Sequence, residues 1–199
     1  MENKIIKSII EPISTMFAYL KGYKKIVVLG MQAAGKTTFL CHLRGKEYVQ
    51  EGTSTDPFGS FSIKLDNDKM YIDEGVDIGG GESYISEYPD LIKDANIVFF
   101  IFNSYLYVFD SKYQLKTNAR LDFIYRHLPP QKKICIVGSH LDVYKEKYKK
   151  NDAVNAIREI IFNEKDYPKK YKTLLNDGEF VVDNLTIREN VIDIISKFK

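Results

Sequence analysis

Residues 30–37 read Gly30-Met31-Gln32-Ala33-Ala34-Gly35-Lys36-Thr37, with two glycines five positions apart followed directly by lysine and threonine. A short apolar run, residues 24–30, precedes this motif, and a helical pattern over residues 36–43 follows it. Glycines in such a turn let the backbone wrap closely around phosphate oxygens, while backbone N–H groups and the helix N-terminus supply partial positive charge. The motif and its context therefore predict a phosphate-binding loop, or P-loop.

Individual P-loop residues have predicted roles toward a nucleoside triphosphate. We expect Lys36 to act as a compact cation on the β and γ phosphates, and the Thr37 hydroxyl to coordinate Mg²⁺. Gln32 can either reach the γ-phosphate or obstruct an arginine supplied by a partner protein. Backbone contacts to the phosphates are also expected from the other motif residues, Gly30, Ala33, Ala34 and Gly35.

The rest of the chain alternates apolar strands with helical patterns. Buried strands are expected at residues 24–30, 97–102, 133–138 and 179–182. Helices are expected at residues 36–43, in a stretch ending near residue 93, and at residues 114–127, 151–163 and 187–198. Residues 61–65 and 70–76 alternate around Asp66-Asn67-Asp68, which predicts a hairpin. This order indicates an α/β fold: a mostly parallel central sheet with helices on both faces and one antiparallel hairpin strand.

A second group for the Mg²⁺ site is predicted at the end of the third apolar strand. Asp77 ends that strand and is followed by Gly79 and Gly80. A carboxylate there can hold the water shell of Mg²⁺, and the Gly80 N–H can bond a γ-phosphate only when that phosphate is present. Such a bond would couple the following helix to the nucleotide state. An ordinary turn at a strand end is the alternative.

The loop of residues 46–60 is rich in Gly, Ser, Thr, Asp and Pro and has no periodic pattern, as in functional loops. Thr53 and Thr55 could each bring a hydroxyl to Mg²⁺, and we prefer Thr55 because Phe58 follows it. A polar loop with no metal contact is the alternative.

Base recognition is predicted beyond the strand that ends at Gly138. Asp142 lies there, and one carboxylate can accept hydrogen bonds from both N1–H and the N2 amino group of guanine, whereas adenine has no such donor pair. The alternative is a surface aspartate that caps a helix.

The chain resembles the small GTPases over residues 24–199, and within them the ADP-ribosylation factor branch and the signal-recognition-particle receptor β subunit. Two segments carry the resemblance: the P-loop Ala33-Ala34-Gly35-Lys36-Thr37-Thr38, and Asp77-Ile78-Gly79-Gly80, which is similar to the double-glycine switch II of that branch. The resemblance implies GTP or GDP with Mg²⁺ as cofactors and makes Thr38 a nucleotide contact.

The resemblance also places the base contacts. Ser139-His140-Leu141-Asp142 stands where the family has Asn/Thr-Lys-x-Asp, so His140 and Asp142 are expected at the guanine base. Asn184-Leu185 stands where a family loop offers a backbone N–H to guanine O6.

Gly81 occupies the position of the water-orienting glutamine of the family, so we expect slow intrinsic hydrolysis with Lys36, Gln32 and Gly80 as the catalytic groups. The expected function is a GTP-Mg²⁺ switch that contacts an effector or regulatory protein through residues 46–60 and 78–93. One alternative is a pseudo-GTPase scaffold. Another is a P-loop ATPase or kinase, which would need an arginine-rich acceptor pocket, and the few arginines are scattered along the sequence.

Residues 1–22 are expected to form an amphipathic helix in front of a P-loop domain over residues 23–199. Apolar residues from Ile5 to Leu20 recur at helical spacing. We expect this stripe to pack on the domain, with peripheral membrane contact as the alternative. Glu2 stands where N-myristoylation requires glycine, so no lipid is expected at that site.

Composition excludes several classes of protein. The 199 residues suit one domain with a core. The formal charge of +2 comes from basic and acidic residues mixed along the chain, so no nucleic-acid partner is expected. The longest apolar run, residues 97–102, is too short to cross a membrane, and the expected location is cytoplasmic. Cys41 and Cys135 lie in apolar stretches without metal-binding spacing, so both are expected to be buried and reduced.

Overall fold

The structure is a computed structural model that describes residues 22–47, 56–66, 68–144, 155 and 179–198. The N-terminal helix, Thr53, Thr55 and the helix expected at 151–163 lie outside these residues, Asn155 apart, so they stay predictions.

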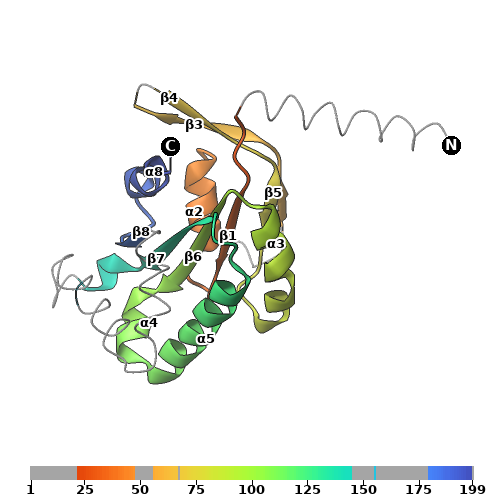
Figure 1. Cartoon of the computed structure of the whole chain (residues 1–199). Coiled ribbons are helices and arrows are strands. Elements are labelled where there is room, and N and C mark those ends of the chain that lie inside the picture. The colour runs from red at the N-terminus through yellow and green to blue at the C-terminus, as the bar shows by residue number, and fades with distance from the viewer. Residues whose placement is uncertain (1–21, 48–55, 67, 145–154, 156–178, 199) are drawn as a thin grey trace.

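The described part of the chain is built on a four-stranded parallel sheet (Figure 1). Its strands follow the order β1 (Ile26–Gly30), β6 (Ile97–Asn103), β7 (Lys133–Ser139) and β8 (Glu179–Val182). All three neighbouring pairs are parallel, and β1 and β6 pair in register from Ile26↔Ile97 to Gly30↔Ile101. The predicted α/β class and its four strands are confirmed.

Helices cover both faces of this sheet (Figure 1). One face carries α2 (Lys36–Leu43) and α8 (Arg188–Ser196), and the guanidinium of Arg188 donates to the His42 carbonyl at 3.1 Å. The other face carries α3 (Tyr88–Asp94) and α5 (Ser111–His127). A sheet covered on both faces requires apolar strands throughout, which is what the sequence showed.

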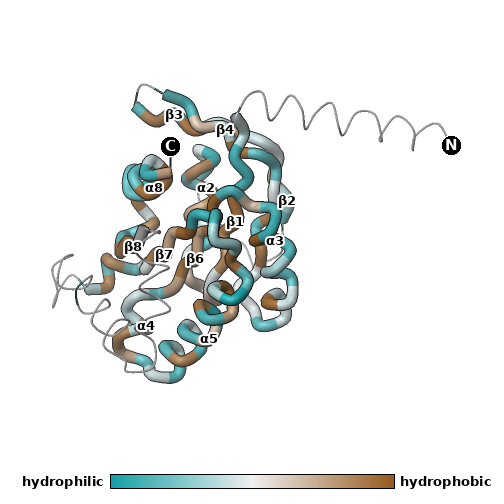
Figure 2. Tube along the Cα trace, in the orientation of Figure 1, coloured by the Kyte–Doolittle hydropathy of each residue, from teal (hydrophilic) through white to brown (hydrophobic). Residues whose placement is uncertain are grey.

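The core lies on and around β6, where hydrophobic segments, coloured brown in Figure 2, are concentrated. All residues of Ile97–Phe102 are buried. Phe99 contacts Phe39 of α2 at a ring-centroid distance of 5.0 Å and Phe198 at 5.6 Å. Aromatic packing therefore fastens α2 and the C-terminal segment to the central strand.

The predicted hairpin is confirmed by one of the two separate two-stranded antiparallel ladders in the described part of the chain. The strand β3 (Phe61–Leu65) pairs with β4 (Asp68–Ile72), and β2 (Asp56–Phe58) pairs with β5 (Gly75–Asp77). The expected strand 70–76 is broken at Asp73, whose carboxylate accepts hydrogen bonds from the Glu74 N–H at 2.9 Å and the Ser60 hydroxyl at 3.3 Å. A side chain that bonds neighbouring backbone in this way competes with the sheet ladder.

Two further elements correct the sequence expectations. The loop predicted at 46–60 contains β2, and residues 104–109 form a short helix, α4 (Ser104–Phe109), which the sequence analysis did not include. Asn103 caps α4 by accepting from the Leu106 N–H at 3.0 Å. The expected helical stretch ending near residue 93 is confirmed: a 3₁₀ helix, η1 (Glu82–Glu87), is followed by α3, which begins beside Pro89 and ends at Asp94.

Neither cysteine forms a disulfide bond, and only Cys135 is buried. Cys41 on α2 is partly exposed, which corrects the expectation of burial. The helical stripe of α2 explains the difference, because Phe39, Leu40 and Leu43 form its buried face.

Candidate functional site

The P-loop connects β1 to α2 in the conformation that the motif requires. Gly30 has φ +148° and Gly35 has φ +91°, both in the region that favours glycine. A Cβ on Gly30 would collide with the backbone carbonyl of Ile101, while the Met31 N–H donates to that same carbonyl at 3.0 Å. Gly30 is thus needed for close packing of the P-loop on β6, a reason that the motif alone did not supply.

Lys36 is the buried cation of this loop. Its side chain lies at the N-terminus of α2 with 7% of the residue exposed, and Nζ donates to the Met31 carbonyl at 3.0 Å. Burial lowers the pKa of Lys36 to about 8, the nearby Asp77 carboxylate opposes that shift, and the Arg120 guanidinium adds to it. An ammonium removed from water in this way gains free energy from an anion beside it.

Asp77 and Thr37 lie together beside Lys36. Asp77 ends β5 with 9% of the residue exposed. Burial raises the pKa of Asp77, while a hydrogen bond with the Thr37 side chain and the charge of Lys36 oppose that shift. A hydroxyl and a carboxylate in contact fit a Mg²⁺ ion that keeps several waters and takes its other ligands from phosphates. In the ranges that the structure describes, no cluster of three or more His, Cys, Asp or Glu forms a separate metal cage.

Gly80 lies directly on the P-loop. A Cβ at Gly80 would lie 2.5 Å from the Cα and N atoms of Gln32 and 2.6 Å from Lys36 Nζ. Only glycine therefore fits between the end of β5 and the P-loop. Gly81 is more open, since the nearest atom to a Cβ there is the Ser83 hydroxyl oxygen at 3.6 Å. The neighbouring Glu82 carboxylate pairs with Lys116 at 3.1 Å on the surface.

Arg120 is a residue of this site that sequence reasoning missed. It lies on α5 with 7% of the residue exposed, and its Nη1 donates to the Gly30 carbonyl at 2.9 Å and to the Gly80 carbonyl at 2.8 Å. The Tyr88 hydroxyl also donates to the Gly30 carbonyl, at 3.4 Å. One signal could have found Arg120: it falls on the same helical stripe as the buried residues Leu121 and Ile124.

The predicted base contacts lie after β7. Ser139 ends this strand, and its hydroxyl donates to the Phe102 carbonyl at 3.0 Å and lies 2.7 Å from His140 Nδ1. His140 has φ +62°, and burial lowers its pKa, a shift that the Asp142 carboxylate opposes. Asp142 is half-buried in the short 3₁₀ helix η2 (Leu141–Tyr144). The serine of this loop therefore ties β7 to β6.

The loop after β8 reaches the P-loop. Leu185 is buried, and its Cδ1 lies 3.6 Å from the position of a Cβ on Gly35. The Asn184 N–H donates to the Asp183 carboxylate at 2.9 Å, and the Asn184 side chain accepts from the Thr186 N–H at 3.0 Å. The loops after β1, β7 and β8 all follow the carboxyl ends of parallel strands, where α/β sheets bind ligands.

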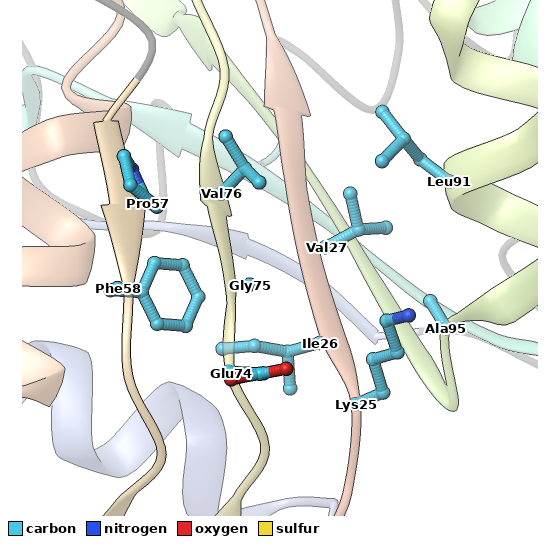
Figure 3. A pocket seen from close by; sticks show the side chains of 10 residues that line it. All are labelled: Lys25, Ile26, Val27, Pro57, Phe58, Glu74, Gly75, Val76, Leu91 and Ala95. Carbon is cyan, nitrogen blue, oxygen red and sulfur yellow. The ribbon is translucent and has the colours of Figure 1, made fainter. Parts of the chain in front are cut away.

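A separate cavity of about 410 Å³ opens between β1 and the β2–β5 pair (Figure 3). It is lined by apolar residues such as Val27, Phe58, Val76 and Leu91, with Lys25 and Glu74 among the lining side chains. No P-loop residue lines this cavity, so it is distinct from the phosphate-binding loop.

A family model described as Ras family matches residues 25–173, which is more than half of the chain. The matched range contains the P-loop, Asp77, Gly80, Arg120 and Asp142. No curated protein matches the chain. Within the described residues, no helix is both long enough and apolar enough to cross a membrane.

Proposed function

The chain belongs to the Ras family, and on this basis we propose that it is a guanine-nucleotide switch that binds GTP with Mg²⁺ and hydrolyses it slowly. The observation that carries the proposal is the convergence of Lys36, Asp77 and Gly80 on the P-loop. A buried ammonium, a carboxylate beside a hydroxyl, and a glycine seated on the loop are the groups that a Mg²⁺-triphosphate requires.

Each of these groups has a distinct task at the phosphates. Lys36 neutralises charge on the β and γ phosphates, and the Gly80 N–H is a donor for the γ-phosphate alone. Thr37 and Asp77 would hold Mg²⁺, Thr37 directly and Asp77 through its water shell, and the ion supplies further charge neutralisation when bound. Thr55 is a further candidate ligand. The backbone of the P-loop, through Thr38, completes the phosphate contacts.

Recognition of guanine would rest on the loops after β7 and β8. The Asp142 carboxylate accepts from the base, and His140 packs beside it. Since the Asn184 N–H is already bonded to Asp183, we assign the Leu185 N–H as the donor to guanine O6. Residues 46–60 and 78–93 would present the nucleotide state to an effector or regulatory protein. The double glycine Gly79-Gly80 supports the ADP-ribosylation-factor-like branch.

Slow hydrolysis follows from Gly81, which has no side chain to orient the attacking water. The backbone of Gln32 lies beside Gly80 and Gln32 is exposed, so its side chain can contact the γ-phosphate or a partner's arginine.

A pseudo-GTPase scaffold is the second candidate, because Ser139, His140 and Gly81 all depart from the family pattern. A P-loop ATPase or kinase is less well supported, since Arg120 lies buried with its guanidinium on the Gly30 and Gly80 carbonyls rather than in an acceptor lid.

Affinity and single-turnover hydrolysis, measured together, test these functions. Affinities are measured by titration with GTP, GDP and ATP, each in Mg²⁺ and in EDTA. Single-turnover hydrolysis is measured with the protein in excess over GTP. A switch gives Mg²⁺-dependent preference for GTP over ATP with slow phosphate release. Binding without any release supports the scaffold, whereas equal affinity for ATP and GTP, or rapid ATP turnover, contradicts the proposal.

A further inference from the structure

Arg120 is a buried cation that bonds two main-chain oxygens and also the Tyr88 side chain. Its Nη1 bonds the carbonyls of Gly30 and Gly80, which lie 90 and 40 positions away in the sequence. None of the ion pairs in the described part of the chain includes Arg120. A guanidinium that is buried without an acid is costly unless backbone acceptors or a bound anion compensate it.

The two carbonyls belong to the two segments that would surround the terminal phosphate. Gly30 begins the P-loop, and Gly80 follows β5 and touches Gln32 and Lys36. Arg120, on α5, therefore links the loop after β5 to the P-loop through one nitrogen of its rigid planar guanidinium.

Gly80 needs such an external anchor. It is the middle residue of Gly79-Gly80-Gly81, a run without side chains that has high backbone freedom before folding. Its own position admits no Cβ, so no larger residue could fix it by packing. The hydrogen bond from Arg120 to the Gly80 carbonyl thus restrains the position of this segment.

We propose that Arg120 is a positioning residue that holds Gly80 against the P-loop and thereby sets the preference for nucleoside triphosphate over diphosphate. This inference rests on the proposed function, because the Gly80 N–H can meet a γ-phosphate only in the triphosphate. A diphosphate leaves Gly80 without a partner, so its affinity does not depend on the anchor.

The test compares Arg120→Met and Arg120→Lys with one control. Arg126→Met changes an exposed arginine of the same helix that pairs with Asp122. Dissociation constants for GTP and GDP are measured with Mg²⁺. Hydrogen exchange of a peptide spanning residues 78–87 is measured without nucleotide.

We expect Arg120→Met to weaken GTP binding roughly 10-fold with GDP binding unchanged, and to accelerate exchange in residues 78–87. Arg120→Lys keeps a donor but not the planar fork, so its GTP affinity and its exchange rate should lie between those of Arg120→Met and the wild type. The Arg126→Met control should keep the wild-type ratio of GDP to GTP affinity.

Three results would overturn the inference. Unchanged exchange in Arg120→Met shows that Arg120 does not anchor Gly80. Faster exchange with equal losses for GTP and GDP shows a purely structural role. Faster exchange with both affinities intact shows that the anchor has no effect on nucleotide choice. A wild-type protein that binds neither guanine nucleotide would instead refute the proposed function, and the exchange result then still decides whether the anchor exists.

Discussion

The loops after β1 and β7 both follow carboxyl ends of parallel strands, but they keep different amounts of the family's chemistry. The P-loop retains Gly30, Gly35, Lys36 and Thr37 and gains support from Asp77, Gly80 and Arg120. The loop after β7 retains Asp142 alone, with Ser139 and His140 in place of the family residues. Under the proposed function, phosphate binding would therefore rest on many mutually supporting groups, and base recognition on few.

This comparison is explained by what surrounds each loop. Replacing Gly80 or Gly30 would force backbone atoms together, since a Cβ at either position meets main-chain atoms of another segment. Ser139, by contrast, is tied to the Phe102 carbonyl, and His140 already adopts a left-handed conformation beside it. The P-loop therefore tolerates little change at Gly30, while the loop after β7 carries Ser139 and His140 in place of the family residues and keeps its contact with β6.

The largest effect is expected from Lys36→Ala, which removes the buried ammonium of the phosphate end. We expect triphosphate affinity to fall at least about 100-fold, because a charge-assisted contact to two phosphates is lost. Calorimetry with GTP measures the loss, and Lys69→Ala, at an exposed lysine of β4, is the matched control. Unchanged affinity would show that the P-loop does not bind phosphate here.

Asp142→Asn tests whether the base end still recognises guanine. The substitution exchanges a double acceptor for a group that also donates, so GTP affinity should fall roughly 10- to 100-fold while xanthosine triphosphate binds better. Competition titrations with GTP, xanthosine triphosphate and ATP check the exchange. Asp94→Asn, at an exposed aspartate on α3, should behave as the wild type. If the wild type already binds ATP and GTP with equal affinity, Asp142 is not a guanine contact.

Gly81→Gln tests the phosphate side of this comparison, because it places a glutamine where the family has its water-orienting side chain. A Cβ there meets nothing closer than 3.6 Å, so the glutamine can be accommodated. We expect single-turnover hydrolysis to rise ~10-fold if the restored contact lowers the barrier by about 1.4 kcal/mol. Gly59→Gln, at a glycine with open space around it, is the control. A wild-type rate near ~1 per second would mean that another residue already orients the water.

The smallest effect is expected from His140→Asn at acidic pH. Burial lowers the pKa of His140, with Asp142 opposing, so the unfolded chain binds a proton near pH ~6.5 that the folded chain resists. Stability is therefore lost as the pH falls below that value and is retained above it. Asparagine tolerates the φ of +62°.

Melting temperatures at pH 7.5 and 5.5 measure this effect. The acid-induced decrease should be smaller in His140→Asn than in the wild type, and His127→Asn controls for the loss of one histidine. An equal decrease in the wild type and in His140→Asn would show that His140 does not resist protonation in the folded state.

The sequence alone was enough to predict the P-loop, the four strands of the parallel sheet and the helices α2, α5 and α8, because these depend on spacing within a few residues. The motif Gly30–Thr37 specifies its turn and its cation locally, and the run of residues 97–102 predicts a strand buried on both faces. The site residues Asp77 and Gly80 could also be predicted from the sequence, since both lie at or just after the end of an apolar strand.

Only the tertiary structure decided which groups meet. Arg120 had no role in the sequence analysis, and only the packing of α5 places it where it bonds carbonyls 90 and 40 positions away. Gly30 looked like a phosphate-wrapping residue until the proximity of Ile101 showed why it must lack a side chain. At the break in the strand, Asp73 likewise accepts a hydrogen bond from Ser60, 13 positions away. Such contacts join segments distant in sequence, and their free energy depends on three-dimensional packing that no local pattern contains.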